Sequence, residues 1–125
     1  MGESDTPVVL IAEDEAMLRV VAAETLRDEG FLVLEAGDGV DALDVLRGHP
    51  EVRLLISDIK MPRLGGYDLA EAALTLRPEL KIVLMTGYTQ DPSPQFVQEA
   101  GIQTLHKPFE LARLSRIAGE MLSLG

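Results

Sequence analysis

The chain contains the stretch Leu54-Leu55-Ile56-Ser57-Asp58-Ile59-Lys60-Met61-Pro62, in which an apolar run ends at an aspartate and a proline-containing loop follows. The run does not alternate apolar with polar residues. A strand of this kind is buried on both faces, which is typical of a parallel sheet covered by helices. Comparable apolar runs occupy residues 8–12, 31–34, 81–85 and, more weakly, 103–106. The sequence therefore predicts five parallel strands.

The segments between these runs have helical spacing. After the first run, Leu18, Val21, Ala22, Thr25 and Leu26 recur at i, i+3, i+4, i+7 and i+8, which predicts a helix that turns these side chains to the core and ends at Gly30. Four more helices are predicted around residues 42–46, 69–76, 96–100 and 111–121. A strand followed by a helix, five times over, predicts an α/β fold with right-handed crossovers and an open, doubly wound sheet.

Length and composition restrict the class of protein. A chain of 125 residues suits one domain, here 1–125, and residues 1–7 are expected to be a flexible N-terminus. The chain has no cysteine, which excludes disulfides, thiol catalysis and cysteine zinc sites and favours a cytoplasmic location. No apolar run approaches the roughly 20 residues that cross a bilayer.

The formal net charge is −10, and 14 of the 21 acidic residues lie between Met1 and Pro62. Binding to nucleic acid or to an anionic membrane requires a basic face, so neither is expected as a partner. Most of the acidic residues suit solvated helix surfaces. A few of them, however, directly follow predicted strands.

In an open α/β sheet the functional crevice lies beyond the carboxyl ends of the strands. The residues expected there are Glu13 and Asp14, Asp58, Thr86 and Gly87, and Lys107 and Pro108. Crowded carboxylates repel one another, and a divalent cation resolves that repulsion. Oxygen ligands without histidine or cysteine select a hard ion, so we expect Mg²⁺, with Mn²⁺ as an alternative.

This set of residues suits phosphoryl transfer. The Lys107 ammonium and the Thr86 hydroxyl could neutralise and orient a phosphoryl group beside the metal. Asp58 is the central acid and precedes an irregular loop, so it is the expected nucleophile. Its product would be an acyl phosphate.

Four motifs together resemble the receiver domains of bacterial two-component response regulators. They are Glu13-Asp14, Asp58 to Pro62 with Gly66, Thr86-Gly87, and Lys107-Pro108-Phe109. The resemblance extends from Val8 to about Leu122. It implies a flavodoxin-like (βα)5 fold with strand order 2-1-3-4-5.

By this resemblance, Asp58 accepts a phosphoryl group from a phosphohistidine of a sensor histidine kinase or a phosphotransfer protein, and the domain then switches conformation. Asp14, Asp58 and the backbone carbonyl of Lys60 would coordinate Mg²⁺, with Glu13 assisting through water. Thr86 and Gly87 would follow the phosphoryl group, and Lys107 would pair with it. The Lys107–Pro108 peptide bond is expected to be cis.

Two finer roles also follow from the resemblance. Lys60 and Tyr88 stand two residues after Asp58 and Thr86, where relatives tune autodephosphorylation. Met17 and Val20 are apolar, lie off the predicted core stripe and are close to Asp14, so they are expected to help dock the phosphodonor.

The sequence departs from the common receiver pattern at two places. The position three residues before the lysine, usually tyrosine or phenylalanine, is Thr104, so the phosphorylation signal is expected to stay within residues 86–94 while the fifth strand stays nearly still. The fourth helix has no lysine or arginine for pairing through that surface, and a monomer is expected. Thr86-Gly87-Tyr88 resembles receivers of hybrid histidine kinases and single-domain regulators.

Rival classes fit less well. A phosphohydrolase acting through an aspartyl phosphate usually has a second aspartate where this chain has Lys60, so no enzymatic turnover of other substrates is expected. A dinucleotide-binding domain would need glycines after the first strand. A phosphorylation-independent binding module would not need the intact set of acids, threonine and lysine. His49 and His106 are interpreted as a loop residue and an edge-strand residue without a role in phosphotransfer.

Overall fold

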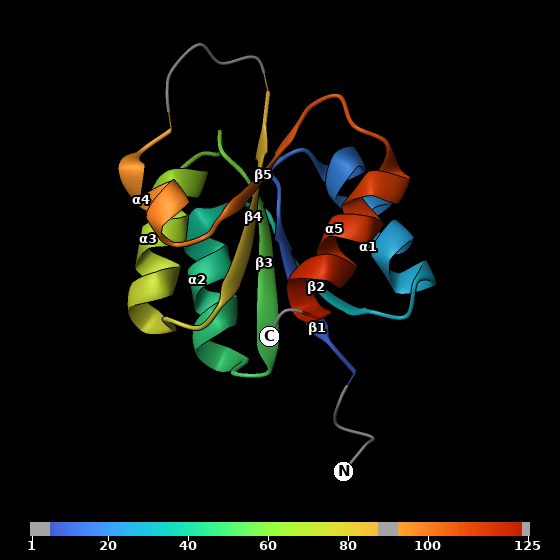
Figure 1. Cartoon of the computed structure of the whole chain (residues 1–125), viewed down its shortest axis with the longest axis horizontal. Coiled ribbons are helices and arrows are strands. Elements are labelled where there is room, and N and C mark those ends of the chain that lie inside the picture. The colour runs from blue at the N-terminus through green and yellow to red at the C-terminus, as the bar shows by residue number, and fades with distance from the viewer. Residues whose placement is uncertain (1–5, 88–92, 124–125) are drawn as a thin grey trace.

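The computed structural model describes residues 6–87 and 93–123, shown in Figure 1. Strands and helices alternate along the chain. The strands are β1 (Val8–Ala12), β2 (Leu32–Ala36), β3 (Val52–Asp58), β4 (Lys81–Thr86) and β5 (Gln103–His106). The helices are α1 (Ala16–Asp28), α2 (Gly39–Gly48), α3 (Gly66–Leu76), α4 (Gln95–Glu99) and α5 (Leu111–Ser123). Of the N-terminal segment expected to be flexible, residues 1–5 lie outside the described part of the chain.

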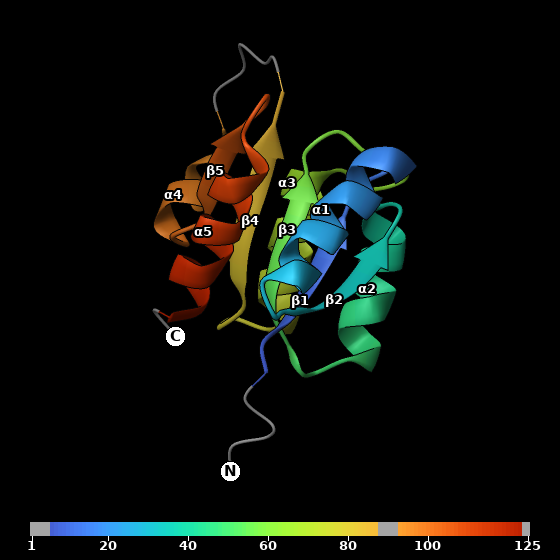
Figure 2. The ribbon, with the colours of Figure 1, turned by 90° about the vertical axis from the view of Figure 1, so that its right-hand side faces the viewer.

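The five strands form one sheet in the order β2-β1-β3-β4-β5, and all neighbours are parallel. This confirms the predicted flavodoxin-like topology. Helices α1 and α5 cover one face of the sheet and α2, α3 and α4 cover the other, as Figures 1 and 2 show. Among the described residues, no helix combines the length and apolar character needed to cross a membrane.

The central strands are buried on both faces because their side chains enter two separate cores. On β3, Leu55 packs in the core under α2 and α3, whereas Leu54 and Ile56 pack in the core under α1 and α5. Neighbouring residues of a strand point to opposite faces, so an uninterrupted apolar run is what a central strand requires. Packing on both faces holds each central strand in place, and this fixes the position of its carboxyl end.

Helix α1 differs in part from the predicted stripe. Ala22 and Leu26 are buried as expected, but Ala23 is buried as well. Leu18 and Val21 remain 43% and 41% exposed. The reason is that α1 starts beside the carboxyl edge of the sheet, where its first turns line an open groove instead of the core.

The edge strand β2 is tied to α1 by charged side chains. Glu35 accepts hydrogen bonds from Arg19 Nε and Arg27 Nη2, each at 3.2 Å. Arg27 Nη2 also donates to the backbone carbonyl of Val33 at 2.9 Å. Arg19 Nη1 donates to the carbonyl of Glu13 at 2.8 Å, which connects this network to the end of β1.

Candidate functional site

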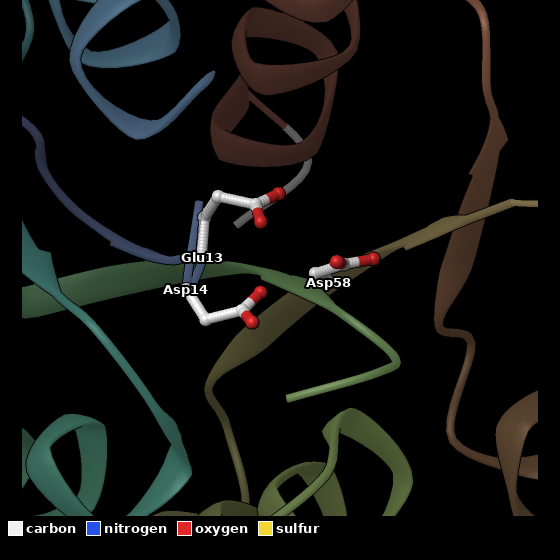
Figure 3. Close-up of side chains that lie close together, drawn as sticks. All are labelled: Glu13, Asp14 and Asp58. Carbon is white, nitrogen blue, oxygen red and sulfur yellow. The ribbon is translucent and has the colours of Figure 1, made fainter. Parts of the chain in front are cut away.

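Three acidic side chains from two strand ends converge at the carboxyl edge of the sheet. Glu13 and Asp14 follow β1, and Asp58 is the last residue of β3. Figure 3 shows their carboxylates gathered in the space between these two strand ends. Each of the three offers an oxygen, and these oxygens lie within 4.8 Å of one another. The predicted acidic cluster is therefore formed by the fold.

Lys107, which follows β5, extends its ammonium into this cluster. Its Nζ lies 3.3 Å from Asp58 Oδ2 and 3.4 Å from Glu13 Oε1. Burial lowers the pKa of the ammonium, but the charges of Asp58 and Glu13 outweigh that effect and raise the pKa above its usual value. Lys107 therefore stays charged and offsets part of the repulsion among the acids.

Glu13 is almost fully buried, with 3% of its surface exposed. Burial raises the pKa of its carboxyl above the usual value, the charge of Asp58 adds to this rise, and the backbone N–H of Glu15 and the Lys107 ammonium oppose it. The N–H of Glu15 donates to Glu13 Oε2 at 3.1 Å and holds the side chain in place. The Lys107 ammonium thus favours the charged form of Glu13, which burial disfavours.

Asp58 is buried, and its two carboxylate oxygens have different partners. Oδ1 accepts a hydrogen bond from the backbone N–H of Ile59 at 2.9 Å. Oδ2 faces the Lys107 ammonium. The Ser57 hydroxyl donates to the Asp58 carbonyl at 2.8 Å and adds to the order of the strand end. One oxygen is thus fixed by the backbone, and the other is directed toward positive charge.

The donor set suits a hard divalent cation. It consists of carboxylate oxygens alone, and Asp14 is exposed, so water can complete the coordination of an ion. Lys60 lies exposed in the loop after Asp58, and within the described residues no hydrogen bond engages its carbonyl oxygen. The residues therefore fit Mg²⁺, which keeps several waters when bound to protein carboxylates.

The loop between β3 and α3 packs tightly against the end of β3. A Cβ placed on Gly66 would lie 2.4 Å from the Asp58 carbonyl oxygen, and one on Gly39 would lie 2.4 Å from the Leu64 carbonyl oxygen. Glycine is therefore required at both positions. On the other side of the site, the Lys107–Pro108 peptide bond is cis.

Arg63 ties this loop to the start of α2. Its backbone is in the left-handed region at φ 68°, and its guanidinium binds Asp38 through two hydrogen bonds of 2.7 and 3.1 Å. A third hydrogen bond, of 2.9 Å, runs to Asp41. Asp38 also caps α2, since its Oδ1 accepts from the Asp41 backbone N–H. The ion pair stabilises a loop backbone that is otherwise unfavourable for arginine.

This ion pair predicts a pH dependence of stability. The Arg63 hydrogen bonds, followed by the Asp41 N–H, lower the pKa of Asp38 below its usual 3.8. A lowered carboxyl pKa contributes stability that is complete above the unfolded-state pKa and is lost as pH falls through the folded-state pKa. Asp38→Asn, which keeps the helix cap, should therefore lower the urea midpoint at pH 7, and the difference from wild type should shrink below about pH 4.

Asp44→Asn is the matched control, because Asp44 is an exposed acid of α2 whose one ion pair among the described residues is with Arg47. Its effect on the urea midpoint should be small at every pH. A deficit of Asp38→Asn that stays constant from pH 7 to pH 3 would contradict the role assigned to the Asp38 charge.

Thr86 is buried at the end of β4, and its hydroxyl lies 2.8 Å from His106 Nδ1. Gly87, next along the chain, is exposed. Tyr88 and residues 89–92 lie outside the described residues, and with them part of the segment expected to carry the signal. Sequence reasoning missed the contact of His106 and the ion pair of Arg63. The sequence indicated that His106 ends a strand, but it contained no signal that the ring would meet the Thr86 hydroxyl.

An apolar surface adjoins the acidic cluster. Met17 and Val20 are 73% and 47% exposed on α1, as the docking hypothesis requires. Beside them, Leu18, Val21 and the exposed Leu111 of α5 line a groove that Glu13 and Lys107 of the acidic cluster also line. Exposed apolar side chains concentrated next to a charged site are typical of a surface that binds a protein.

Comparison with known proteins gives one family. Residues 9–118 match the family described as the response regulator receiver domain. The transcriptional regulatory protein PdtaR of Mycobacterium tuberculosis is 42% identical over 108 residues, which are 85% of this chain and 52% of PdtaR. The response regulator receiver protein CpdR of Brucella abortus is 32% identical over 117 residues, which are 91% of this chain and 95% of CpdR.

Solved structures agree with the sequence comparisons. The receiver domain from the hybrid histidine kinase CckA is 31% identical to this chain with a TM-score of 0.78, and the match covers 92% of this chain and 98% of that domain. The chain thus spans about half the length of PdtaR and nearly all of CpdR.

Proposed function

The chain belongs to the response regulator receiver domain family, and from that premise we propose that Asp58 is its phosphoacceptor. Receiver domains are modules of phosphorylation-based signal transduction and not classical enzymes. They partner with histidine kinases or phosphotransfer proteins. The resemblance seen in the sequence is thereby confirmed for the family, and the roles of individual residues are what we propose here.

One observation carries the proposal. Asp58 lies in the cluster with Glu13 and Asp14, its Oδ1 is held by the Ile59 N–H, and its Oδ2 lies 3.3 Å from the Lys107 ammonium. In the proposed reaction, Asp58 Oδ2 attacks the phosphorus of a phosphohistidine, the N–P bond breaks, and the electron pair returns to the imidazole of the donor. Lys107 then pairs with the phosphoryl oxygens and with the new acyl phosphate.

We assign Glu13, Asp14, Asp58 and the carbonyl of Lys60 to a Mg²⁺ site. The family generally binds Mg²⁺. When bound, the ion would neutralise charge on the transferring phosphoryl group and help to hold it in line with the attacking oxygen. Residues of the chain itself orient and neutralise the other groups. The Ile59 N–H orients Asp58, and Lys107 offsets the negative charge of Glu13.

The test is phosphorylation by acetyl phosphate. With Mg²⁺ the protein should gain the mass of one phosphoryl group, and with excess EDTA it should gain none. Asp14→Asn should raise the Mg²⁺ concentration for half-maximal labelling at least about tenfold. Loss of a residue that only supports a metal ligand typically costs about 10–100-fold in affinity, and loss of a ligand should cost no less. Labelling that is independent of Mg²⁺ would contradict the metal assignment while leaving Asp58 as acceptor.

A phosphohydrolase acting on outside substrates is the second candidate, and the site gives it little support. The position two residues after Asp58, where such an enzyme usually has a second aspartate, is the exposed Lys60. Instead, we propose that Lys60 tunes the lifetime of the acyl phosphate from the loop. The same role for Tyr88 remains a hypothesis from the sequence, because Tyr88 lies outside the described residues.

We further propose that Met17 and Val20 contact the phosphodonor protein. They are exposed on α1 next to the groove that Lys107 lines, so a donor seated there would hold its phosphohistidine near Asp58. The double variant Met17→Ser/Val20→Ser should slow phosphotransfer from a phosphorylated histidine kinase by about tenfold, the effect of losing roughly 1.4 kcal/mol of apolar burial. Labelling by acetyl phosphate should be unchanged.

Leu76→Ser provides the matched control, because Leu76 is a 44% exposed apolar residue of α3. It should leave both reactions as in wild type. Equal losses with kinase and with acetyl phosphate in the double variant would show damage to the site and would overturn the docking role.

A further inference from the structure

The hydroxyl of Thr86 has a partner that no motif indicated. Thr86 Oγ1 and His106 Nδ1 are 2.8 Å apart, although 20 positions separate the residues. The two residues are register partners at the ends of the parallel strands β4 and β5. The Lys107 N–H donates to the Thr86 carbonyl at 2.7 Å and keeps the two strand ends aligned. The contact is therefore set by the sheet itself.

His106 belongs to neither hydrophobic core of the described structure. It is exposed on β5, and within the described residues Thr86 is the one hydrogen-bond partner of its ring. Leu105, between Thr104 and His106, is buried in the core under α5, so the side chains of 104 and 106 lie on the opposite face of the strand. The His106 imidazole thus lies on the same face of β5 as Thr104 and two residues closer to the carboxyl end of the strand, where the site lies.

A hydroxyl has one hydrogen to donate. While that hydrogen is donated to His106 Nδ1, it is not available to a phosphoryl oxygen on Asp58. In the ring tautomer whose Nδ1 carries no hydrogen, the Thr86 hydroxyl is the donor of this contact, and it must then leave the imidazole before it can donate to the phosphoryl group.

We propose that His106 is a positioning residue, which holds the Thr86 hydroxyl in the unphosphorylated protein and competes for it with the phosphoryl group on Asp58. This inference rests on the proposed function, because it takes Asp58 as the acceptor. His106 Nδ1 accepts the hydroxyl hydrogen in the resting protein and loses it on phosphorylation. The released imidazole then carries the signal to β5, the strand that the sequence alone predicts to stay nearly still.

The resting contact can be tested without any phosphate. The chain has two histidines, His49 and His106, so ¹⁵N NMR can assign both rings. Thr86→Val keeps the shape of the side chain and removes the hydroxyl, and it should shift the Nδ1 resonance of His106 while leaving that of His49 in place. An unshifted His106 ring would overturn the proposal whatever the protein does with phosphate.

Competition can be tested with beryllofluoride and Mg²⁺, a mimic of the phosphorylated state. His106→Phe keeps an aromatic ring but accepts no hydrogen bond, and it should bind the mimic about fivefold more tightly, the change expected from removing one competing hydrogen bond. His106→Asn, whose amide oxygen can take the place of Nδ1, should bind as wild type does. His49→Phe is the control and should also match wild type.

The outcomes separate the two proposals. Unchanged or weaker binding by His106→Phe would overturn the competition. Wild-type protein that does not bind the mimic at all would contradict the proposed function, and the ring measurement on the free protein would still decide whether His106 holds Thr86.

Discussion

Replacing Asp58 with asparagine is expected to reduce Mg²⁺-dependent labelling by acetyl phosphate at least about a thousandfold, to background, because loss of a nucleophile removes the covalent step itself. An asparagine side chain has nearly the same size and can keep the hydrogen bond from the Ile59 N–H. The fold should therefore survive, and the circular dichroism spectrum should match that of wild type. Mass spectrometry of the intact protein measures the result.

Asp44→Asn is the control, since Asp44 is an exposed acid of α2 away from the site. Its labelling should equal that of wild type, and hydroxylamine should remove the label, as expected for an acyl phosphate. Labelling that persists in Asp58→Asn would instead identify Glu13 or Asp14, the other two acids of the cluster, as the acceptor.

Gly66→Ala is expected to have the largest effect on stability. The added Cβ would stand 2.4 Å from the Asp58 carbonyl oxygen and 2.8 Å from the Ile59 Cα, and both are backbone atoms that no side-chain rotation can move. The loop must shift, and with it the hydrogen bond from the Gly66 N–H to the Ile59 carbonyl. Overpacking of this kind costs about 3 kcal/mol of unfolding free energy, measured by urea denaturation.

The same shift displaces the residues next to Asp58, so labelling by acetyl phosphate should slow in Gly66→Ala even where the protein is fully folded. Gly119→Ala is the matched control. Gly119 lies within α5, and nothing stands within 4 Å of an added Cβ. That substitution should stabilise the protein by up to about 1 kcal/mol. Equal stability of the two variants would contradict the close approach at Gly66.

The main parts of the site could be predicted because they depend on one regularity. The carboxyl ends of parallel strands all lie at the same edge of a sheet. The polar residues that follow the apolar runs therefore meet at that edge, although helices separate the strands in the sequence. Asp58 and Lys107 are 49 positions apart, yet locating the ends of β3 and β5 was sufficient to bring them together. The fold and the acidic cluster followed from periodicity and from family resemblance.

The remaining contacts depend on side-chain geometry that periodicity does not contain. Leu18 and Val21 have core spacing, but their turns of α1 lie at the rim of the sheet and line a groove. Arg63, which pairs with Asp38, has a left-handed backbone conformation that the sequence pattern does not predict. The contact of His106 with Thr86 requires the register of β4 against β5, and a shift of one residue would remove it.

The arginines of α1 have a consequence for the outer boundary of the sheet. An open sheet ends in strands whose unpaired backbone groups invite pairing with another chain and, with it, aggregation. On β2, the Val33 carbonyl is occupied by Arg27, and the charge of Glu35 is held in place by Arg19 and Arg27. A second strand approaching along β2 would have to displace these side chains and desolvate their charges. The same residues that anchor α1 to the sheet thus make its edge a poor template for further strands.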